Sequence, residues 1–204
     1  MRRLIPLLVA LLACAYAYAG SNVVYSKQVV RDVPVHVVTA NLNSPNVHVS
    51  PAISRHGVGT SEGFGSMLSR LQPAAAITGT YFCVRSLIPV GDIVVSGERV
   101  NRGCVGTGMC FTPENKVEFR RTKRDKPNDW EGFSSVVCSG PRLVTKGVVY
   151  VAPKAEGFKD PSVSRKAQRC AMGITKHNKL LLVTVNKPIY LSHLARIMKD
   201  LGAV

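Results

Sequence analysis

The sequence contains few acidic residues and few aromatic residues. Only 12 Asp and Glu oppose 27 Lys and Arg in 204 residues, and aromatic residues make up 6% of the chain. The resulting formal net charge of +15 favours anionic partners such as cell-envelope polymers or phosphorylated substrates. Nucleic acid is not expected, because the densest basic run, residues 120–126, has no aromatic side chain on which a base could stack. That run is interpreted as the solvated tip of a hairpin.

Motifs for metal binding are also missing. The sequence has no C-x-x-C and no His–Cys cluster, which excludes the common structural zinc sites, and it identifies no cofactor. His36 and His48 fall on the polar faces of expected strands, where exposed histidines are the ordinary interpretation. Five cysteines follow residue 19, so at least one thiol has no partner within the chain. A bridge between Cys104 and Cys110 stays open.

Apolar runs long enough to cross a membrane are absent. The N-terminal run, residues 4–13, is shorter than the roughly 20 residues that a spanning helix needs. Two arginines precede it and Ala17-Tyr18-Ala19 follows, which predicts a signal peptide over residues 1–19. The chain is therefore expected to be exported and to be periplasmic or secreted. Cys14 leaves an alternative open, a lipoprotein anchored through this cysteine, and a membrane is an expected partner only in that case.

Two amphipathic helices are predicted from apolar residues spaced three and four apart. The first begins at a cap formed by Thr60 or Ser61, runs to about Leu71 and is ended by Pro73. The second covers residues 191–201, with a glycine directly after its end.

The remaining periodic segments are short and predict strands. Residues 33–38 and 47–50 alternate between apolar and polar side chains, and other short apolar runs lie between turn residues. These further strands are expected at 23–25, 75–77, 93–95, 110–111, 117–119, 136–139, 143–144, 148–151, 171–175 and 180–185. The pattern predicts an α+β fold, with a mixed, largely antiparallel sheet of short strands and two principal helices. No linker rich in Pro, Ser or Gly divides residues 22–204, so one domain is expected.

One catalytic motif matches by its residues but lacks the preceding buried strand that its chemistry requires. Residues 59–63 match G-x-S-x-G, but a serine hydrolase places this serine between a buried strand and a helix. Residues 55–58 are not such a strand, so Ser61 is interpreted as a helix cap.

Five segments, in this order, resemble the phosphodiester glycosidase family. They are AAAITGTYF, PVGDIVVSGERV, CSGPRLVTKG, RCAMGITKHNKLLLVTVN and YLSHLARIMKDLGA. The family pattern at these places includes Asn-Gly-x-Phe/Tyr-Phe, Gly-Pro-x-Leu-Val, Arg-Thr-Ala-x-Gly and a helix that ends in Leu-Gly-Ala. The resemblance covers residues 22–204 and implies a hydrolase whose partner is a sugar phosphodiester or an anionic envelope polysaccharide.

The resemblance also implies site residues. Arg169 is the expected catalytic residue, because a guanidinium can hold two phosphate oxygens at once. The expected substrate-binding residues come from the first and third segments, where glycines admit main-chain N–H groups and aromatic rings can pack on a sugar. They are Thr78, Gly79, Tyr81, Phe82, Gly140 and Pro141.

Three departures from the family pattern bear on activity. Thr78 stands where the family has Asn, and Cys170 stands where it has Thr. The family continues past Leu-Gly-Ala into an Asp-Gly-Gly-x-Ser segment, so the sequence is expected to be either a fragment, truncated at its C-terminus, or a degenerate member of the family. Glycoside cleavage generally uses carboxylates, and weak or absent catalysis is therefore expected. The alternative is a non-catalytic basic module that binds anionic cell-envelope polymer.

Overall fold

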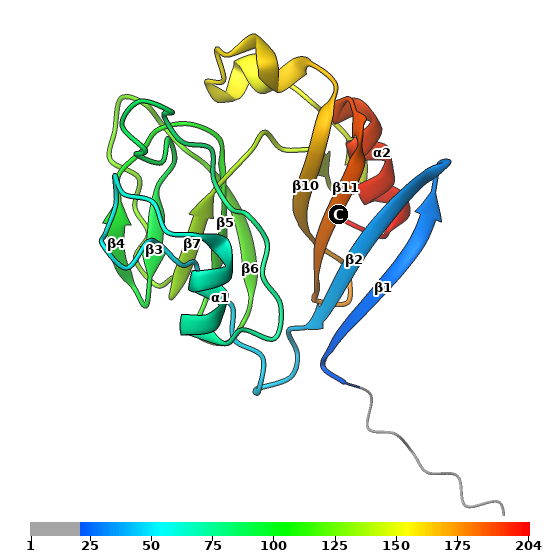
Figure 1. Cartoon of the computed structure of the whole chain (residues 1–204), viewed down its shortest axis with the longest axis horizontal. Coiled ribbons are helices and arrows are strands. Elements are labelled where there is room, and N and C mark those ends of the chain that lie inside the picture. The colour runs from blue at the N-terminus through cyan, green and yellow to red at the C-terminus, as the bar shows by residue number, and fades with distance from the viewer. Residues whose placement is uncertain (1–20) are drawn as a thin grey trace, which may run out of the picture.

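The computed structural model describes residues 21–204. The predicted signal peptide, residues 1–19, and Cys14 lie outside this range. Two sheets stand side by side (Figure 1). The first has the order β1 (Val23–Val30), β2 (Val33–Asn41), β11 (Lys179–Ile189), β10 (Ala167–Ile174). The second has the order β4 (Glu98–Asn101), β3 (Ile93–Val95), β7 (Ser135–Cys138), β5 (Thr107–Phe111), β6 (Val117–Arg121).

The smaller elements complete the α+β fold that the sequence predicts. β8 (Val144–Thr145) and β9 (Val148–Val149) form a short hairpin. Two 3-10 turns follow, η1 (Pro153–Glu156) and η2 (Pro161–Ser164), and the two helices are α1 (Phe64–Leu71) and α2 (Leu191–Asp200). Every strand pair within residues 21–204 is antiparallel. No helix in this range is long and apolar enough to cross a membrane.

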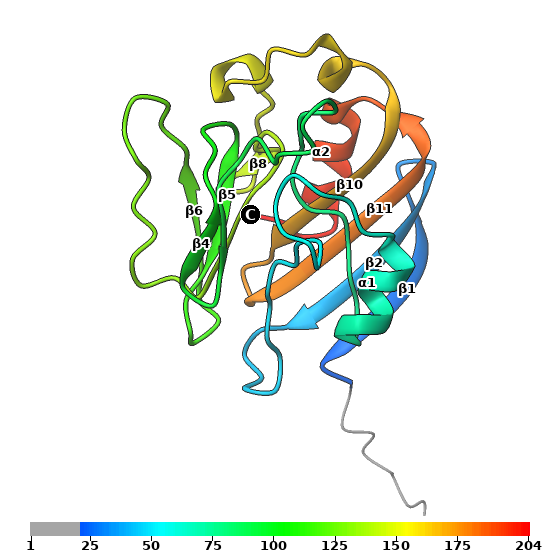
Figure 2. The ribbon, with the colours of Figure 1, turned by 60° about the vertical axis from the view of Figure 1, so that its left-hand side comes forward.

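Helix α2 covers one face of the first sheet (Figure 2). Alternation along β2 and β11 turns valines such as Val35 and Val183 toward it, and Leu194 and Ile197 of α2 are buried in the same cluster. Gly202 follows with φ of 90°, as expected of a glycine that ends a helix.

A second cluster packs the two sheets together. It combines Ala40 and Leu180 of the first sheet with Met109 and Phe111 of β5 in the second. The loop after β2 adds Leu42, which is 2% exposed. Burial of these apolar side chains holds both sheets in one body.

The first part of α1 was predicted wrongly. The helix begins at Phe64, its N-cap is Gly63, and neither Thr60 nor Ser61 caps it. Thr60 Oγ1 instead donates to the carbonyl of Gly57, a local bond that competes with helix formation. The apolar side chains along one side of α1 remain unburied, since no residue of this helix is buried.

Two strand predictions were also wrong. Residues 47–50 and 75–77 have no strand partner, although Val47 is buried in the cluster between the sheets. Segment 75–77 is apolar but only partly buried, and it forms no ladder. Strand propensity is a weak guide where tertiary contacts decide the conformation.

Glu62 holds α1 in place. Its side chain is 4% exposed and accepts bonds from Arg70 Nη2 at 2.7 Å and from the Arg55 main-chain N at 2.9 Å. Arg70 and then Arg55 lower the pKa of Glu62 to about 2, against an ordinary value of 4.5. Because α1 buries no side chain of its own, we infer that this carboxylate, which bonds both Arg70 of the helix and Arg55 of the preceding loop, fixes the helix to that loop.

We expect α1 to lose its protection as the pH falls. A depressed carboxyl pKa contributes stability that is present above about pH 4.5 and is lost as the pH falls towards 2. Hydrogen exchange of a peptide covering residues 62–72, corrected for intrinsic rates, should show this loss between those values. Glu62→Gln should remove the pH dependence, while Glu131→Gln, an exposed acid elsewhere, should keep it. Equal profiles in all three proteins would contradict this role of Glu62.

Candidate functional site

The segment Ala76–Phe82 crosses from the first sheet to the second. Ala76 and Ile77 lie beside Leu182 and Thr184 of β11, where they line a hollow of about 330 Å³. Farther along, a Cβ built on Gly79 would lie 3.7 Å from Val137 Cγ1 of β7. The predicted substrate-binding turn therefore spans both sheets.

A short irregular hairpin fixes the far end of this segment. Phe82 pairs with Pro89 in an antiparallel bridge, and Val90 N donates to Tyr81 O at 2.9 Å. Tyr81 is 36% exposed and Phe82 is 53% exposed. The rings are thus available to a ligand, and neither belongs to the core.

Two predicted site residues, Tyr81 and Gly140, meet at the Tyr81 ring together with Phe158, which the sequence did not predict. Phe158 contacts it edge-to-face, with ring centroids 5.4 Å apart and an interplanar angle of 66°. A Cβ on Gly140 would lie 3.3 Å from Tyr81 Cε2, so the glycine lets the main chain approach the ring. Pro141 follows and is buried. We call Tyr81, Gly140 and Phe158 the Tyr81 cluster.

Thr78 touches Cys170. The Oγ1 and Sγ atoms are 3.0 Å apart, and the thiol also lies 3.7 Å from the Thr78 carbonyl oxygen. These are the two positions at which the sequence departs from the Asn and Thr of the family pattern. The departures form one contact, in which a pair of hydrogen-bonding side chains is exchanged for another.

Arg169 lies next to Cys170 on β10, but on the opposite face of the strand. It pairs with Val185, which is buried under α2, whereas Cys170 pairs with Thr184 at the hollow. Arg169 Nη2 donates to the carbonyls of Val163, at 3.0 Å, and Arg165. Its buried Nε has no hydrogen-bond partner among residues 21–204. The structure therefore does not bring its guanidinium to Thr78, and its phosphate role stays a prediction.

Two buried acids were not predicted as site residues from the sequence. Glu156, in η1, accepts bonds from Thr107 Oγ1 and from Arg142 N at 2.8 Å, and so fixes the main chain directly after Gly140-Pro141. Burial lowers the pKa of Arg142, and Glu156 opposes this change. No local motif marks Glu156, since its partners are 14 and 49 residues away.

Asp92 is the other buried acid and is 0% exposed. Its Oδ1 accepts from Gly103 N at 2.7 Å, and its Oδ2 accepts from Asn128 Nδ2 at 2.9 Å and Trp130 Nε1 at 2.7 Å. Loss of such a buried acceptor typically costs about 1–3 kcal/mol for each donor left unsatisfied. Asp92 therefore joins the hairpin that carries Tyr81 to two distant loops.

The polar face of the first sheet carries further groups at the hollow. Tyr25 Oη lies 2.7 Å from His36 Nδ1, and Thr184 pairs with His36 across β2 and β11. His36 is thus bonded to a tyrosine, and no cluster of three His, Cys, Asp or Glu suited to a metal exists within residues 21–204. All five cysteines of this range are free, and Cys110 is buried in β5.

The G-x-S-x-G match has no hydrolase geometry. Residues 55–59, ahead of Ser61, form turns and not a strand. The strand–turn–helix arrangement that exposes a nucleophilic serine is missing.

Comparison with known proteins identifies the family. A family model described as phosphodiester glycosidase matches residues 72–204, which include the Tyr81 cluster, Thr78 and Cys170. The chain therefore belongs to the phosphodiester glycosidase family. No curated protein sequence matches it.

Two solved structures share the fold. One is a hypothetical protein from Synechocystis, with a TM-score of 0.73, 12% identity, and 88% of this chain aligned to 54% of that one. The other is the catalytic domain of zebrafish N-acetylglucosamine-1-phosphodiester alpha-N-acetylglucosaminidase, auto-inhibited by its pro-peptide. It has a TM-score of 0.69 and 22% identity, and 90% of this chain aligns to 67% of it. The chain thus spans about half of the length of the Synechocystis protein.

We expect Thr78 and Cys170 to be energetically coupled. Thr78→Asn places a larger amide against the thiol, and Cys170→Thr exchanges the sulfur for a branched hydroxyl; each alone should destabilise the fold by about 1 kcal/mol. The double substitution recreates the family pair and should cost at least about 0.5 kcal/mol less than the sum of the two. Urea unfolding of the four proteins measures this difference. Strict additivity would show that the contact does not couple the two positions.

Proposed function

We propose that this family member is an exported hydrolase that cleaves a sugar phosphodiester in an envelope polysaccharide. Family membership supports a glycosidase-type hydrolase. The single observation that carries the proposal is the placement of segment Ala76–Phe82, which lines a hollow on one sheet and presents exposed aromatic rings beside Gly140 on the other.

The sugar and the phosphate would use different parts of this site. A pyranose ring can pack its apolar face on Tyr81 or Phe82, whose rings are exposed. The phosphate would be held by Arg169 on the α2 side of β10, the side on which Val163 and Phe158 also pack; among residues 21–204 its Nε has no hydrogen-bond partner. A buried unpaired donor is costly, and a phosphate oxygen would satisfy it.

The reaction is hydrolysis at the anomeric carbon. Water forms a new bond to that carbon and loses one proton to the leaving phosphate or to solvent, the bond to the phosphate oxygen breaks with its electron pair, and the phosphate leaves as a monoester. A guanidinium stabilises the added negative charge on the leaving phosphate. Glu156 acts as a positioning residue in this proposal, because both of its carboxyl oxygens are bonded to the protein.

Arg169→Ala tests the phosphate role. Loss of a charge-assisted contact of about 1.5–3 kcal/mol should lower turnover of an N-acetylglucosamine phosphodiester by about 10- to 100-fold, at matched folded fraction. Arg165→Ala removes the same charge from an exposed neighbour and should change turnover less than about twofold. Because Arg169 also bonds two carbonyls, circular dichroism must confirm that each variant is folded. Equal turnover in wild type and Arg169→Ala would refute the role, and no turnover in the folded wild type would refute the hydrolase.

Export is tested by the mass of the mature chain. Expression in a bacterial host with its natural N-terminus should yield a periplasmic or extracellular protein that begins at Gly20. A protein that starts at a lipid-modified Cys14 would support the lipoprotein alternative instead. An unprocessed cytoplasmic chain would contradict both.

A further inference from the structure

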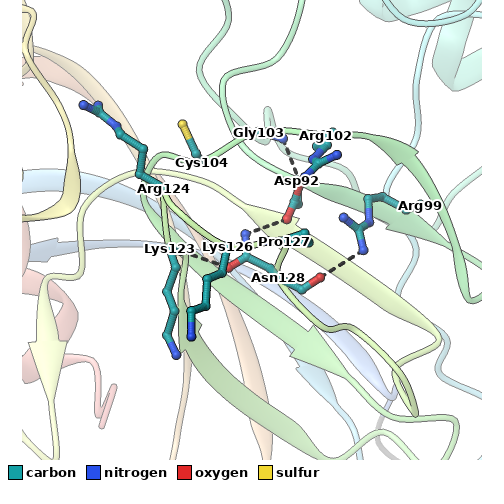
Figure 3. A pocket seen from close by; sticks show the side chains of 10 residues that line it. All are labelled: Asp92, Arg99, Arg102, Gly103, Cys104, Lys123, Arg124, Lys126, Pro127 and Asn128. Carbon is teal, nitrogen blue, oxygen red and sulfur yellow. Dashed lines mark hydrogen bonds between the residues drawn. The ribbon is translucent and has the colours of Figure 1, made fainter.

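A basic hollow lies on the second sheet, away from the residues proposed for catalysis. It has a volume of about 210 Å³ and is bounded by the turn Arg102–Cys104 and by the loop 123–128 (Figure 3). Five cationic side chains line it. They are Arg99, Arg102, Lys123, Arg124 and Lys126. We call this feature the basic hollow.

Hydrogen bonds to a buried carboxyl group hold both walls of the basic hollow in place. The buried Asp92 accepts from Gly103 N in one wall and from Asn128 Nδ2 in the other. Asn128 in turn accepts from Lys123 N through its Oδ1 and from Arg99 Nη2 through its main-chain oxygen, both at 2.9 Å. The positive groups thus sit on a preorganised frame (Figure 3), which reduces the entropy lost on binding.

The positive charge of the basic hollow is only partly neutralised by the protein. Asp92 is the one acid that lines it, and its carboxyl group, whose oxygens accept N–H bonds from neutral donors, can offset one of the five cations. The salt bridges within residues 21–204 involve Arg31, Arg55, Arg70 and Arg120 only. Asp125 belongs to the same loop but is exposed and forms none of them. The cationic side chains that line the hollow point in several directions (Figure 3), and the excess of positive charge around it attracts an anion.

The composition of the cluster indicates the kind of anion. Arginine forks match pairs of phosphate oxygens, and lysines add compact point charges. Five cations exceed what one phosphate dianion can balance, whereas two or three linked phosphate groups carry comparable charge. The volume is too small for a drug-sized organic ligand, which generally occupies about 300 Å³ or more. The chemistry therefore fits a short run of linked phosphate groups.

We propose that the basic hollow is a binding site for linked phosphate groups, second to the catalytic site. The side chain of Arg124 connects the basic hollow to the Tyr81 cluster. A Cβ built on Gly157 would lie 3.9 Å from Arg124 Nη2, and the next residue, Phe158, belongs to the Tyr81 cluster. A phosphate-rich polymer held here would extend toward the exposed aromatic rings. The site does not depend on hydrolysis, so it can exist whether or not the chain is a glycosidase.

Calorimetry with tripolyphosphate in about 50 mM salt tests the site in the protein from residue 20 onward. We expect saturable binding of one ligand per chain, and a change in the fluorescence of Trp130, the single tryptophan, whose Nε1 is bonded to Asp92 Oδ2. Arg102→Gln with Lys123→Gln should weaken binding at least about tenfold. Lys187→Gln with Arg196→Gln, a control pair of exposed cations on β11 and α2, should weaken it less than about threefold.

The comparison between ligands distinguishes a specific binding site from nonspecific electrostatic attraction. Inorganic phosphate should bind at least about tenfold more weakly than tripolyphosphate, and sulfate at equal ionic strength should not displace the latter. Equal losses in the two double variants would show that only net charge matters and would overturn the proposal. Absence of saturable binding, or equal binding of single and linked phosphates, would overturn it as well.

Discussion

One buried carboxyl group joins the loops around the two candidate binding sites of this protein. Asp92 binds Gly103 N, Asn128 Nδ2 and Trp130 Nε1 with its side chain, and its main-chain oxygen accepts from Cys138 N at 3.0 Å. The hairpin of residues 81–90, which carries Tyr81, leads directly into Asp92. Both walls of the basic hollow are hydrogen-bonded to the Asp92 side chain. A buried acceptor with three donors cannot be replaced by an apolar group without stranding those donors.

Close main-chain packing around Asp92 leaves room for glycine only. A Cβ on Gly91 would lie 2.2 Å from Cys138 O, and one on Gly103 would lie 2.3 Å from Val90 O. Asn101 Nδ2 donates to the carbonyls of Pro89 and Gly91, which lie just before β3 and outside the named strands. The region at the start of β3 and the end of β4 is thus built from loops whose polar groups are satisfied by buried side chains as well as by ladders.

The local patterns in the sequence predicted the regular elements well. The hairpin of β10 and β11, the hairpin of β5 and β6, and helix α2 with Gly202 follow from periodicity and turn residues, which act over a few positions. The beginning of α1 was wrong because Thr60 bonds to Gly57 and leaves Gly63 as the cap.

The site residues also divide into those that sequence motifs predicted and those that they did not. Tyr81 and Gly140 could be inferred from family motifs, and the structure brings them into contact. Asp92, Glu156 and the basic hollow could not, because their partners are up to 49 residues away in the sequence. Burial of a polar group and its compensation are properties of the packed chain, and no short window of residues contains them.

The contact between Thr78 and Cys170 suggests how the site has changed relative to the family pattern. The Thr78 side chain contacts Cys170 of β10, and the next residue, Gly79, approaches Val137 of β7. A hydroxyl is shorter than an amide, and the polarisable sulfur of Cys170 lies 3.0 Å from it. The two departures thus meet in one contact that joins segment Ala76–Phe82 to β10. The contact between Tyr81 and Gly140 lies farther along the chain and includes neither of the two departures.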